Sequence, residues 1–155
     1  ANLRNMIYWK DVPYGNGGSV VAIARDKSGK EVARHRIETA GKAVALRIEA
    51  ETPTDWKADG MDLQYINVTV IDKKGRPVWD YNEPLTLQME GAARLVALDN
   101  GDHYTDELFH GITSKRMYQG RMQIILRSDQ EAGNVTVKIS SAGLKGTLRL
   151  KTIKE

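Results

Sequence analysis

The stretch MDLQYINVTVID at residues 61–72 decides the fold of this chain. β-Branched apolar side chains recur in it at every second position, with more polar side chains between them. A period of two is typical of a strand that packs one face against a core, and β-branched residues favour such a pleated surface. We expect Ile66, Val68 and Val70 on the packed face, and Asn67, Thr69 and Ile71 on the wetter face.

The sequence that follows predicts the end of this strand. Residues 72–75, DKKG, are typical of a turn whose glycine can adopt a positive φ, and Pro77 cannot donate a hydrogen bond to a continuing ladder. We therefore predict a central strand of a β-sandwich, with the rest of the chain packed around it.

Segments of the same kind recur along the chain, separated by turn signals such as DKSG at 26–29 and DNGD at 99–102. About seven short strands in residues 42–155 predict an immunoglobulin-like β-sandwich, and the fold class is all-β. No stretch predicts a helix of three turns. The other segments that we expect to be strands are 20–25, 31–38, 44–50, 85–91, 95–98, 121–127, 135–140 and 147–151.

Residues 1–41 predict a partial small β domain of three strands with little apolar material. The small-residue connector TAG at 39–41 is the expected boundary with the sandwich. The chain begins within a pattern, which suggests a piece of a longer protein. An incomplete sheet leaves an edge unpaired, so we expect residues 1–41 to dock on the sandwich or to self-associate with another copy.

The composition excludes several classes of function. The 155 residues are 41% hydrophobic and 28% charged, as in a globular domain, and no apolar run is long enough to span a membrane. The net charge of +3 is spread among nearly equal numbers of basic and acidic residues, so no basic stripe predicts nucleic-acid binding. The chain has no cysteine, which excludes disulfides, thiolate metal sites and a cysteine nucleophile.

Several short motifs resemble a known family when they are taken in order. WKDVPY at 9–14, GKEVA at 29–33 and ETAG at 38–41 resemble a small β domain of bacterial glycoside hydrolase family 2 enzymes of β-galactosidase type. ADG at 58–60 and DNGD at 99–102 resemble the C-terminal immunoglobulin-like domain of that family, which is similar to invasin-type domains. The resemblance covers nearly the whole chain.

This resemblance implies a non-catalytic C-terminal accessory fragment, because the catalytic barrel of the family lies upstream. The implied partner is the catalytic part of the parent enzyme, and the implied location is periplasmic or extracellular. Two alternatives from other classes are a carbohydrate-binding module and an adhesin-type bacterial domain.

No catalytic residue, metal site or cofactor is predicted. Glycosidases use two carboxylates flanking the scissile bond, and the pair Asn82-Glu83 resembles the family's Asn-Glu pair only as a dipeptide in a turn before Pro84. The acidic residues from Asp99 to Glu107 lack the spacing of an EF-hand calcium loop, and the three histidines lack the spacing of a helical zinc site.

Aromatic and polar side chains of loops are the remaining candidates for contacts with sugar or with a neighbouring domain. Trp and Tyr rings offer rigid apolar platforms with a polar edge. We expect Trp56, in a polar loop, to be exposed and Trp79 to fill the core. The long irregular loop at 99–118 is the expected contact surface, because loops on a rigid scaffold tend to carry function. The candidate residues are Trp56, Asp102, His103, Tyr104 and His110.

Overall fold

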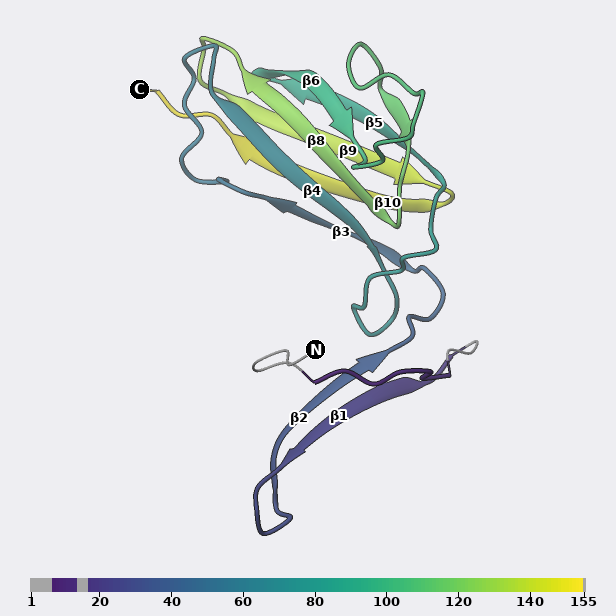
Figure 1. The fold of residues 1–155 in the computed structure, drawn as a ribbon. Coiled ribbons are helices and arrows are strands. Elements are labelled where there is room, and N and C mark those ends of the chain that lie inside the picture. Colours follow the sequence, from purple (N-terminus) through teal and green to yellow (C-terminus); the bar gives the residue numbers. More distant parts are fainter. Residues whose placement is uncertain (1–6, 14–16, 155) are drawn as a thin grey trace. The chain divides into compact units, whose positions relative to one another are not determined.

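The structure is a computed structural model that describes residues 7–13 and 17–154, and these residues form ten strands and no helix (Figure 1). Consequently, no helix in the described part is long and apolar enough to cross a membrane. The chain divides into two compact units, Ala1–Thr39 and Ala40–Glu155. The strands are β1 Ser19–Arg25, β2 Glu31–Glu38, β3 Ala45–Ala50, β4 Leu63–Ile71, β5 Pro84–Gly91, β6 Ala93–Asp99, β7 Ser114–Arg116, β8 Arg121–Ser128, β9 Asn134–Ser141 and β10 Leu144–Lys151.

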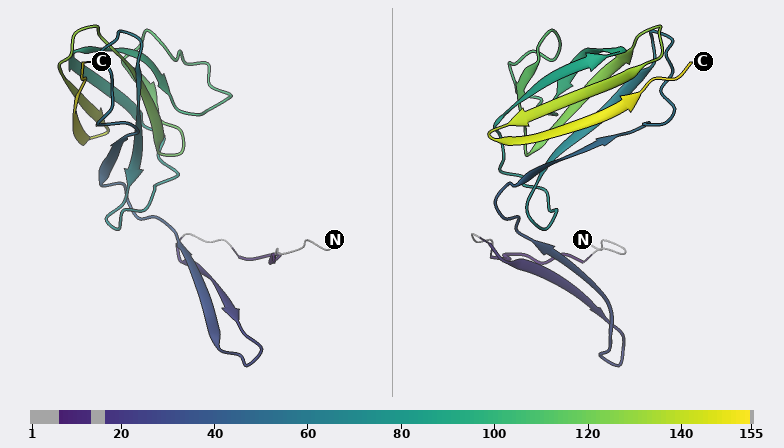
Figure 2. Two further views of the ribbon diagram at one scale, coloured as in Figure 1. Left: turned by 90° about the vertical axis from the view of Figure 1, so that its left-hand side faces the viewer. Right: turned by 180° about the vertical axis from the view of Figure 1, so that it is seen from behind.

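The second unit is a sandwich of two four-stranded sheets (Figure 2). One sheet has the strand order β3-β4-β8-β6 and the other has the order β10-β9-β5-β7, and every pairing is antiparallel. Two antiparallel sheets that face each other bury alternate residues of each strand between them. The prediction of an all-β sandwich is therefore confirmed.

Strand β4 holds the central position that its sequence predicted. It pairs with β3 on one side and with β8 on the other. Its side chains alternate between buried and half-buried along the whole strand. Ile66, Val68 and Val70 are at most 1% exposed, and the residues between them lie on the outer face, as expected.

The core lies between the two sheets and is formed by apolar side chains from nearly every strand of the second unit. Trp56, which belongs to the loop between β3 and β4, is also part of it. The buried hydrophobic residues are Trp56, Ile66, Val68, Val70, Val78, Leu85, Leu87, Ala93, Leu98, Met117, Met122, Ile124, Leu126, Val135, Val137, Ile139 and Leu150. All of them lie within residues 40–155, so the sandwich has a core of its own.

The expected environments of two tryptophans were wrong. Trp56 is completely buried among the core residues, and its indole Nε1 donates a hydrogen bond to the Asp62 carbonyl at 3.1 Å. Trp79 is 47% exposed instead of filling the core, and the Arg121 guanidinium lies 4.3 Å from its ring centroid. This distance is within the range of a cation–π contact.

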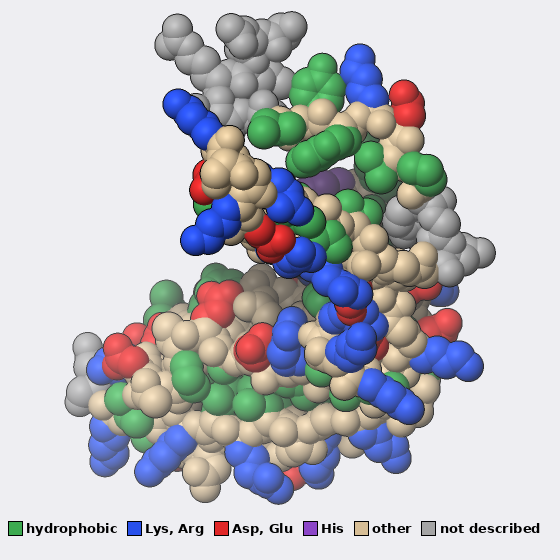
Figure 3. Space-filling view, turned by 90° about the horizontal axis from the view of Figure 1, so that it is seen from below, with side chains coloured by type: hydrophobic (Ala, Val, Ile, Leu, Met, Phe, Trp, Pro, Cys, Tyr) green, Lys and Arg blue, Asp and Glu red, His purple; other side chains and the backbone are tan. Residues whose placement is uncertain are grey.

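The first unit is a hairpin of β1 and β2. Only two of its three predicted strands form, because residues 7–13 are irregular, and the part of the prediction that falls on residues 1–6 and 14–16 lies outside the described residues. Directly opposite residues of an antiparallel pair share a face, so Val20 and Ile37 lie together, and both are more than half exposed. Figure 3 shows hydrophobic side chains at the surface of this unit.

The strands of the second unit differ from their predicted bounds mainly near the loop at 99–118. Strand β7 lies within this predicted irregular segment, and it was missed because three residues are too few to show an alternation. Strand β10 also begins three residues earlier than predicted, since Gly146 interrupts its apolar pattern.

Candidate functional site

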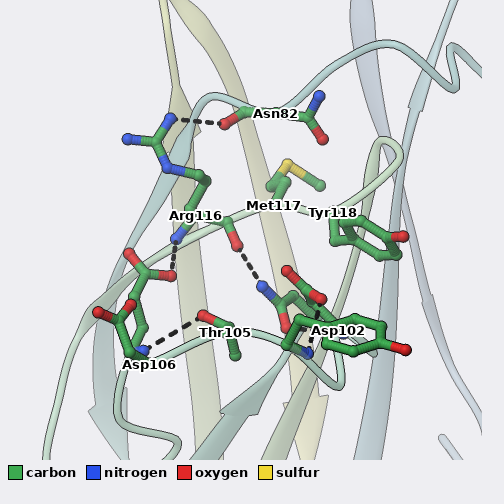
Figure 4. Close-up of a pocket in the computed structure, with 10 residues that line it drawn as sticks. Asn82, Asp102, Thr105, Asp106, Arg116, Met117 and Tyr118 are labelled. Carbon is green, nitrogen blue, oxygen red and sulfur yellow. Dashed lines mark hydrogen bonds between the residues drawn. The ribbon is translucent and has the colours of Figure 1, made fainter.

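A polar hollow of about 570 Å³ lies in the second unit (Figure 4). It lies at one end of the sandwich, where the loop between β6 and β7 meets the loop before β5 and the end of β7. It is lined by Asn82, Asn100, Asp102, Tyr104, Thr105, Asp106, Glu107, Arg116, Met117 and Tyr118. The predicted functional loop therefore supplies most of this lining.

The base of this loop is fixed by Lys115, a lysine that is only 2% exposed. Its ammonium donates hydrogen bonds to the carbonyl groups of Glu107 and Leu108, each at 3.0 Å. The same ammonium lies 4.0 Å from the centroid of the Phe109 ring, within the range of a cation–π contact. A buried charge that is fully satisfied in this way holds the two sides of the loop together.

Short side chains shape the loop where it leaves β6. The buried Asn100 donates to the Arg116 carbonyl at 2.9 Å, and its side-chain oxygen accepts from the Asp102 amide at 3.1 Å. Asp102 in turn accepts from the Tyr104 amide at 3.0 Å. Asn and Asp side chains commonly bind backbone groups two residues further on, and such turns give an irregular chain a defined path.

The opposite wall comes from Arg116 and the loop before β5. One guanidinium nitrogen of Arg116 donates to the Asn82 carbonyl at 3.2 Å, and the Arg116 amide donates to Glu107 Oε2 at 3.2 Å. The Asn82 side-chain oxygen accepts from the Gln119 amide at 3.1 Å. Figure 4 shows Arg116 and Asn82 across the hollow from Asp102 and Asp106, with Met117 between these walls.

Two tyrosines complete the lining. Tyr104 is 97% exposed, so its ring projects into solvent from the loop. Tyr118 is 39% exposed and lies at the side of the hollow (Figure 4). Met117 below them is 1% exposed and belongs to the core, which makes the floor rigid.

The structure separates the residues that the sequence grouped as candidates. Asp102 and Tyr104 line the hollow, whereas His103 and His110 are exposed and lie outside its lining. Trp56 is buried in the core, so its side chain offers no surface for a ligand. Among the remaining lining residues, only Asn82 lies outside the loop at 99–118 that was predicted as the contact surface. Asn82 and Arg116 are 34 positions apart, and only the pairing of β5 with β7 brings them together.

The described part of the chain contains no group of three or more His, Asp or Glu side chains placed to hold a metal ion. The polar groups of the hollow are carboxylates, amides, a guanidinium, two phenol hydroxyls and the hydroxyl of Thr105, which can bind a polar molecule by hydrogen bonds.

One family matches most of the sandwich. The family described as "Glycoside hydrolase family 2 C-terminal domain 5" matches residues 46–148. A β-galactosidase of Bacteroides ovatus is 32% identical over 128 residues, which are 83% of this chain and 15% of that protein. A β-galactosidase of Thermoanaerobacter pseudethanolicus is 30% identical over 132 residues, which are 83% of this chain and 17% of that protein.

Solved structures of glycoside hydrolase family 2 enzymes are also similar to this chain. A glycosyl hydrolase family 2 member from Bacteroides cellulosilyticus has a TM-score of 0.83 and 28% sequence identity, and the match covers 92% of this chain and 18% of that chain. The chain thus spans less than a fifth of the length of the proteins to which it is similar.

Proposed function

This chain belongs to the glycoside hydrolase family 2 C-terminal domain 5 family, and from that premise we propose that it supports the catalytic part of a longer β-glycosidase. It is not an enzyme by itself, because it matches only a C-terminal part of its relatives and its described residues form no catalytic barrel. The proposed role is mechanical: a rigid accessory domain that stabilises the parent enzyme during carbohydrate degradation.

The observation that supports this proposal is the small share of the similar β-galactosidases that this chain covers, 15% and 17% of their lengths. The similar β-galactosidases contain more than 80% of their sequence outside the matched region. An accessory domain in this position needs a stable core of its own and a surface for its neighbours. The second unit supplies the core, and a further surface is offered by the hairpin of the first unit.

The proposed contact with the rest of the parent enzyme is the apolar side of the β1–β2 hairpin. Val20 is 55% exposed and Ile37 is 64% exposed, and these two residues lie opposite each other in the register. A two-stranded hairpin is marginally stable by itself. Covering such apolar side chains with another part of the parent protein would stabilise the hairpin and tie it to its neighbour.

This proposal is tested in the longer protein to which the chain belongs. We expect Ile37→Asp to shorten the half-life of β-galactoside hydrolysis at elevated temperature, because a charge would be buried at the contact. Met61→Asp is the matched control, since Met61 is 72% exposed in the other unit. Turnover of nitrophenyl galactosides by the purified chain alone, or an unchanged half-life for Ile37→Asp, would contradict the proposal.

A second variant separates two possible contact surfaces. Leu108 is 63% exposed in the loop between β6 and β7, which the sequence predicted as the contact surface. If that loop makes the contact, Leu108→Asp shortens the half-life and Ile37→Asp does not. We expect the reverse result.

A further inference from the structure

We propose that the hollow between the β6–β7 loop and Arg116 binds a neutral carbohydrate, in addition to the supporting role of the chain. The ligand class is an uncharged oligosaccharide, held without any bond being broken. This inference does not depend on the contact through the β1–β2 hairpin, because the two features lie in different units.

The first argument is that polar groups around the hollow are held in place and still have unused hydrogen-bonding capacity. Asp102 Oδ1 accepts from the Tyr104 amide and Glu107 Oε2 accepts from the Arg116 amide. The second oxygen of each carboxylate, and both oxygens of Asp106, have no partner among the described residues. Asp102 and Glu107 are each held by one hydrogen bond, so their free oxygens bind a ligand with little further loss of conformational freedom, and Asp106 adds acceptors that are not held in this way.

The second argument is that the free groups include donors as well as acceptors. Arg116 uses one guanidinium nitrogen for the Asn82 carbonyl and retains its other donors. A sugar hydroxyl both donates and accepts, so neighbouring hydroxyls can bind a carboxylate and a guanidinium at the same time. The hydroxyl groups of Tyr104 and Tyr118 can also donate and accept at the rim.

The third argument concerns the aromatic ring of Tyr104. At 97% exposure this ring contributes almost nothing to the packing of the domain, whereas the backbone that carries it beside the hollow is held by the hydrogen bond from the Tyr104 amide to Asp102. A tyrosine face can cover the apolar face of a sugar ring while polar neighbours bind the hydroxyls. Tyr118 offers a second, half-exposed ring at the side (Figure 4).

The charge of the lining selects between classes of carbohydrate. Three carboxylates, those of Asp102, Asp106 and Glu107, face one guanidinium, that of Arg116. A uronic acid or a sulfated sugar would bring a further negative charge beside these carboxylates, and like charges at close range repel. The hollow therefore favours uncharged sugars.

The test is a titration of the ¹⁵N-labelled full chain with sugar probes, in which NMR monitors the shifts of the amide signals. The neutral probes are β-1,4-galactobiose and cellotetraose, and the acidic probe is tetragalacturonate. We expect a neutral probe to shift the amide signals of Asp102, Tyr104 and Arg116 with a Kd on the order of 1 mM, because the hollow is open. We expect tetragalacturonate to bind at least about tenfold more weakly.

Two pairs of variants locate the site. Tyr104→Ala removes the ring platform and Asp102→Asn removes a charged acceptor, and we expect each to weaken binding of the neutral probe by about tenfold. Tyr8→Ala and Glu131→Gln are the matched controls, because both side chains are exposed outside the hollow and we expect unchanged affinity.

Three outcomes would overturn the proposal. One is the absence of shifts with both neutral probes up to about 20 mM, well above the expected Kd. Another is binding whose shifts lie elsewhere on the sandwich or that is as strong in Tyr104→Ala as in the unmodified chain. The third is binding of tetragalacturonate that equals or exceeds binding of the neutral probes.

Discussion

At the scale of single residues, the side chain of Lys115 holds the loop that lines the hollow. It is 2% exposed and satisfies two carbonyl groups of the loop. Lys115→Met keeps the length of the side chain but leaves both carbonyls without a donor. We expect a loss of about 2–3 kcal/mol in the free energy of unfolding, because hydrogen bonds from a charged group are lost in a buried position. Urea unfolding measures this loss.

The control is Lys138→Met. Lys138 forms an exposed ion pair with Glu90 at 3.3 Å, so we expect a change of less than about 1 kcal/mol. Hydrogen exchange should also become faster in the Lys115 variant for the loop between β6 and β7, but not for β4. Equal losses in the two variants would show that Lys115 does not hold the loop.

A second residue, Asp72, makes the stability of the sandwich depend on pH. The Arg76 side chain donates to its carboxylate at 2.8 Å, and the Gly41 amide donates to it at 2.8 Å. These hydrogen bonds, with that of Arg76 the strongest influence, hold the pKa of Asp72 far below its ordinary value of 3.8. Because the pKa is lowered by folding, the stabilisation is fully present above about pH 4 and is lost as the pH falls below it.

We therefore expect Asp72→Asn to lower the urea midpoint at pH 7, and we expect the difference from the unmodified chain to shrink between about pH 4 and pH 2. Asp55→Asn is the control, since its side chain is 73% exposed and pairs only with Lys57. A difference for Asp72→Asn that stays constant down to pH 2 would contradict this account.

At the scale of elements, the turn between β5 and β6 depends on Gly91. Its φ is 110°, and a Cβ atom at this position would lie 1.9 Å from the carbonyl oxygen of Asn134 in the neighbouring strand. Gly91→Ala therefore combines backbone strain with a steric clash. We expect a loss of roughly 3 kcal/mol in the free energy of unfolding, measured by urea unfolding.

Gly101→Ala separates these two causes. Gly101 also has a positive φ, of 73°, but a Cβ atom there would meet nothing within 4 Å. We expect only the backbone cost of about 1 kcal/mol. An equal loss in the free energy of unfolding for both alanine variants would show that the close approach of β5 and β9 at Gly91 adds no steric cost.

At the scale of the whole molecule, the two units differ in what stabilises them. Every buried hydrophobic residue of the core lies in residues 40–155, whereas the hairpin of β1 and β2 exposes its large apolar side chains. We expect residues 40–155 alone to unfold cooperatively with the same urea midpoint as the full chain. Fluorescence of the buried Trp56 reports the transition.

The complementary fragment, residues 1–39, should show no cooperative transition, because two strands without a core are marginally stable. A marked drop in the urea midpoint for residues 40–155 would show that the hairpin stabilises the sandwich. Cooperative unfolding of residues 1–39 would show that the hairpin is stable by itself.

Local alternation was sufficient to predict most strands. From Ile66 to Val70 in β4 and from Val135 to Ile139 in β9, buried apolar residues occupy every second position, so the buried face of these segments could be read directly. Strand β7 could not be predicted, since its three residues are ordered by pairing with β5 and not by their own pattern.

The candidate site was predictable in part, for the same reason. A long loop rich in polar residues was predicted as the contact surface, and two of its candidate residues, Asp102 and Tyr104, line the hollow. The burial of Trp56 and the exposure of Trp79 were not predictable, because a single large side chain outside a periodic segment carries no signal about its surroundings.

The sequence by itself determined that the chain folds as strands around a core formed by residues 42–155, because burial of alternate side chains is a local property that repeats along each strand. Only the tertiary structure decided which loop residues meet. Asn82 and Arg116 come together with Asp102 because two strands pair and two sheets close over one core. Contacts between residues so far apart depend on the closure of the whole sandwich, and no local pattern encodes that closure.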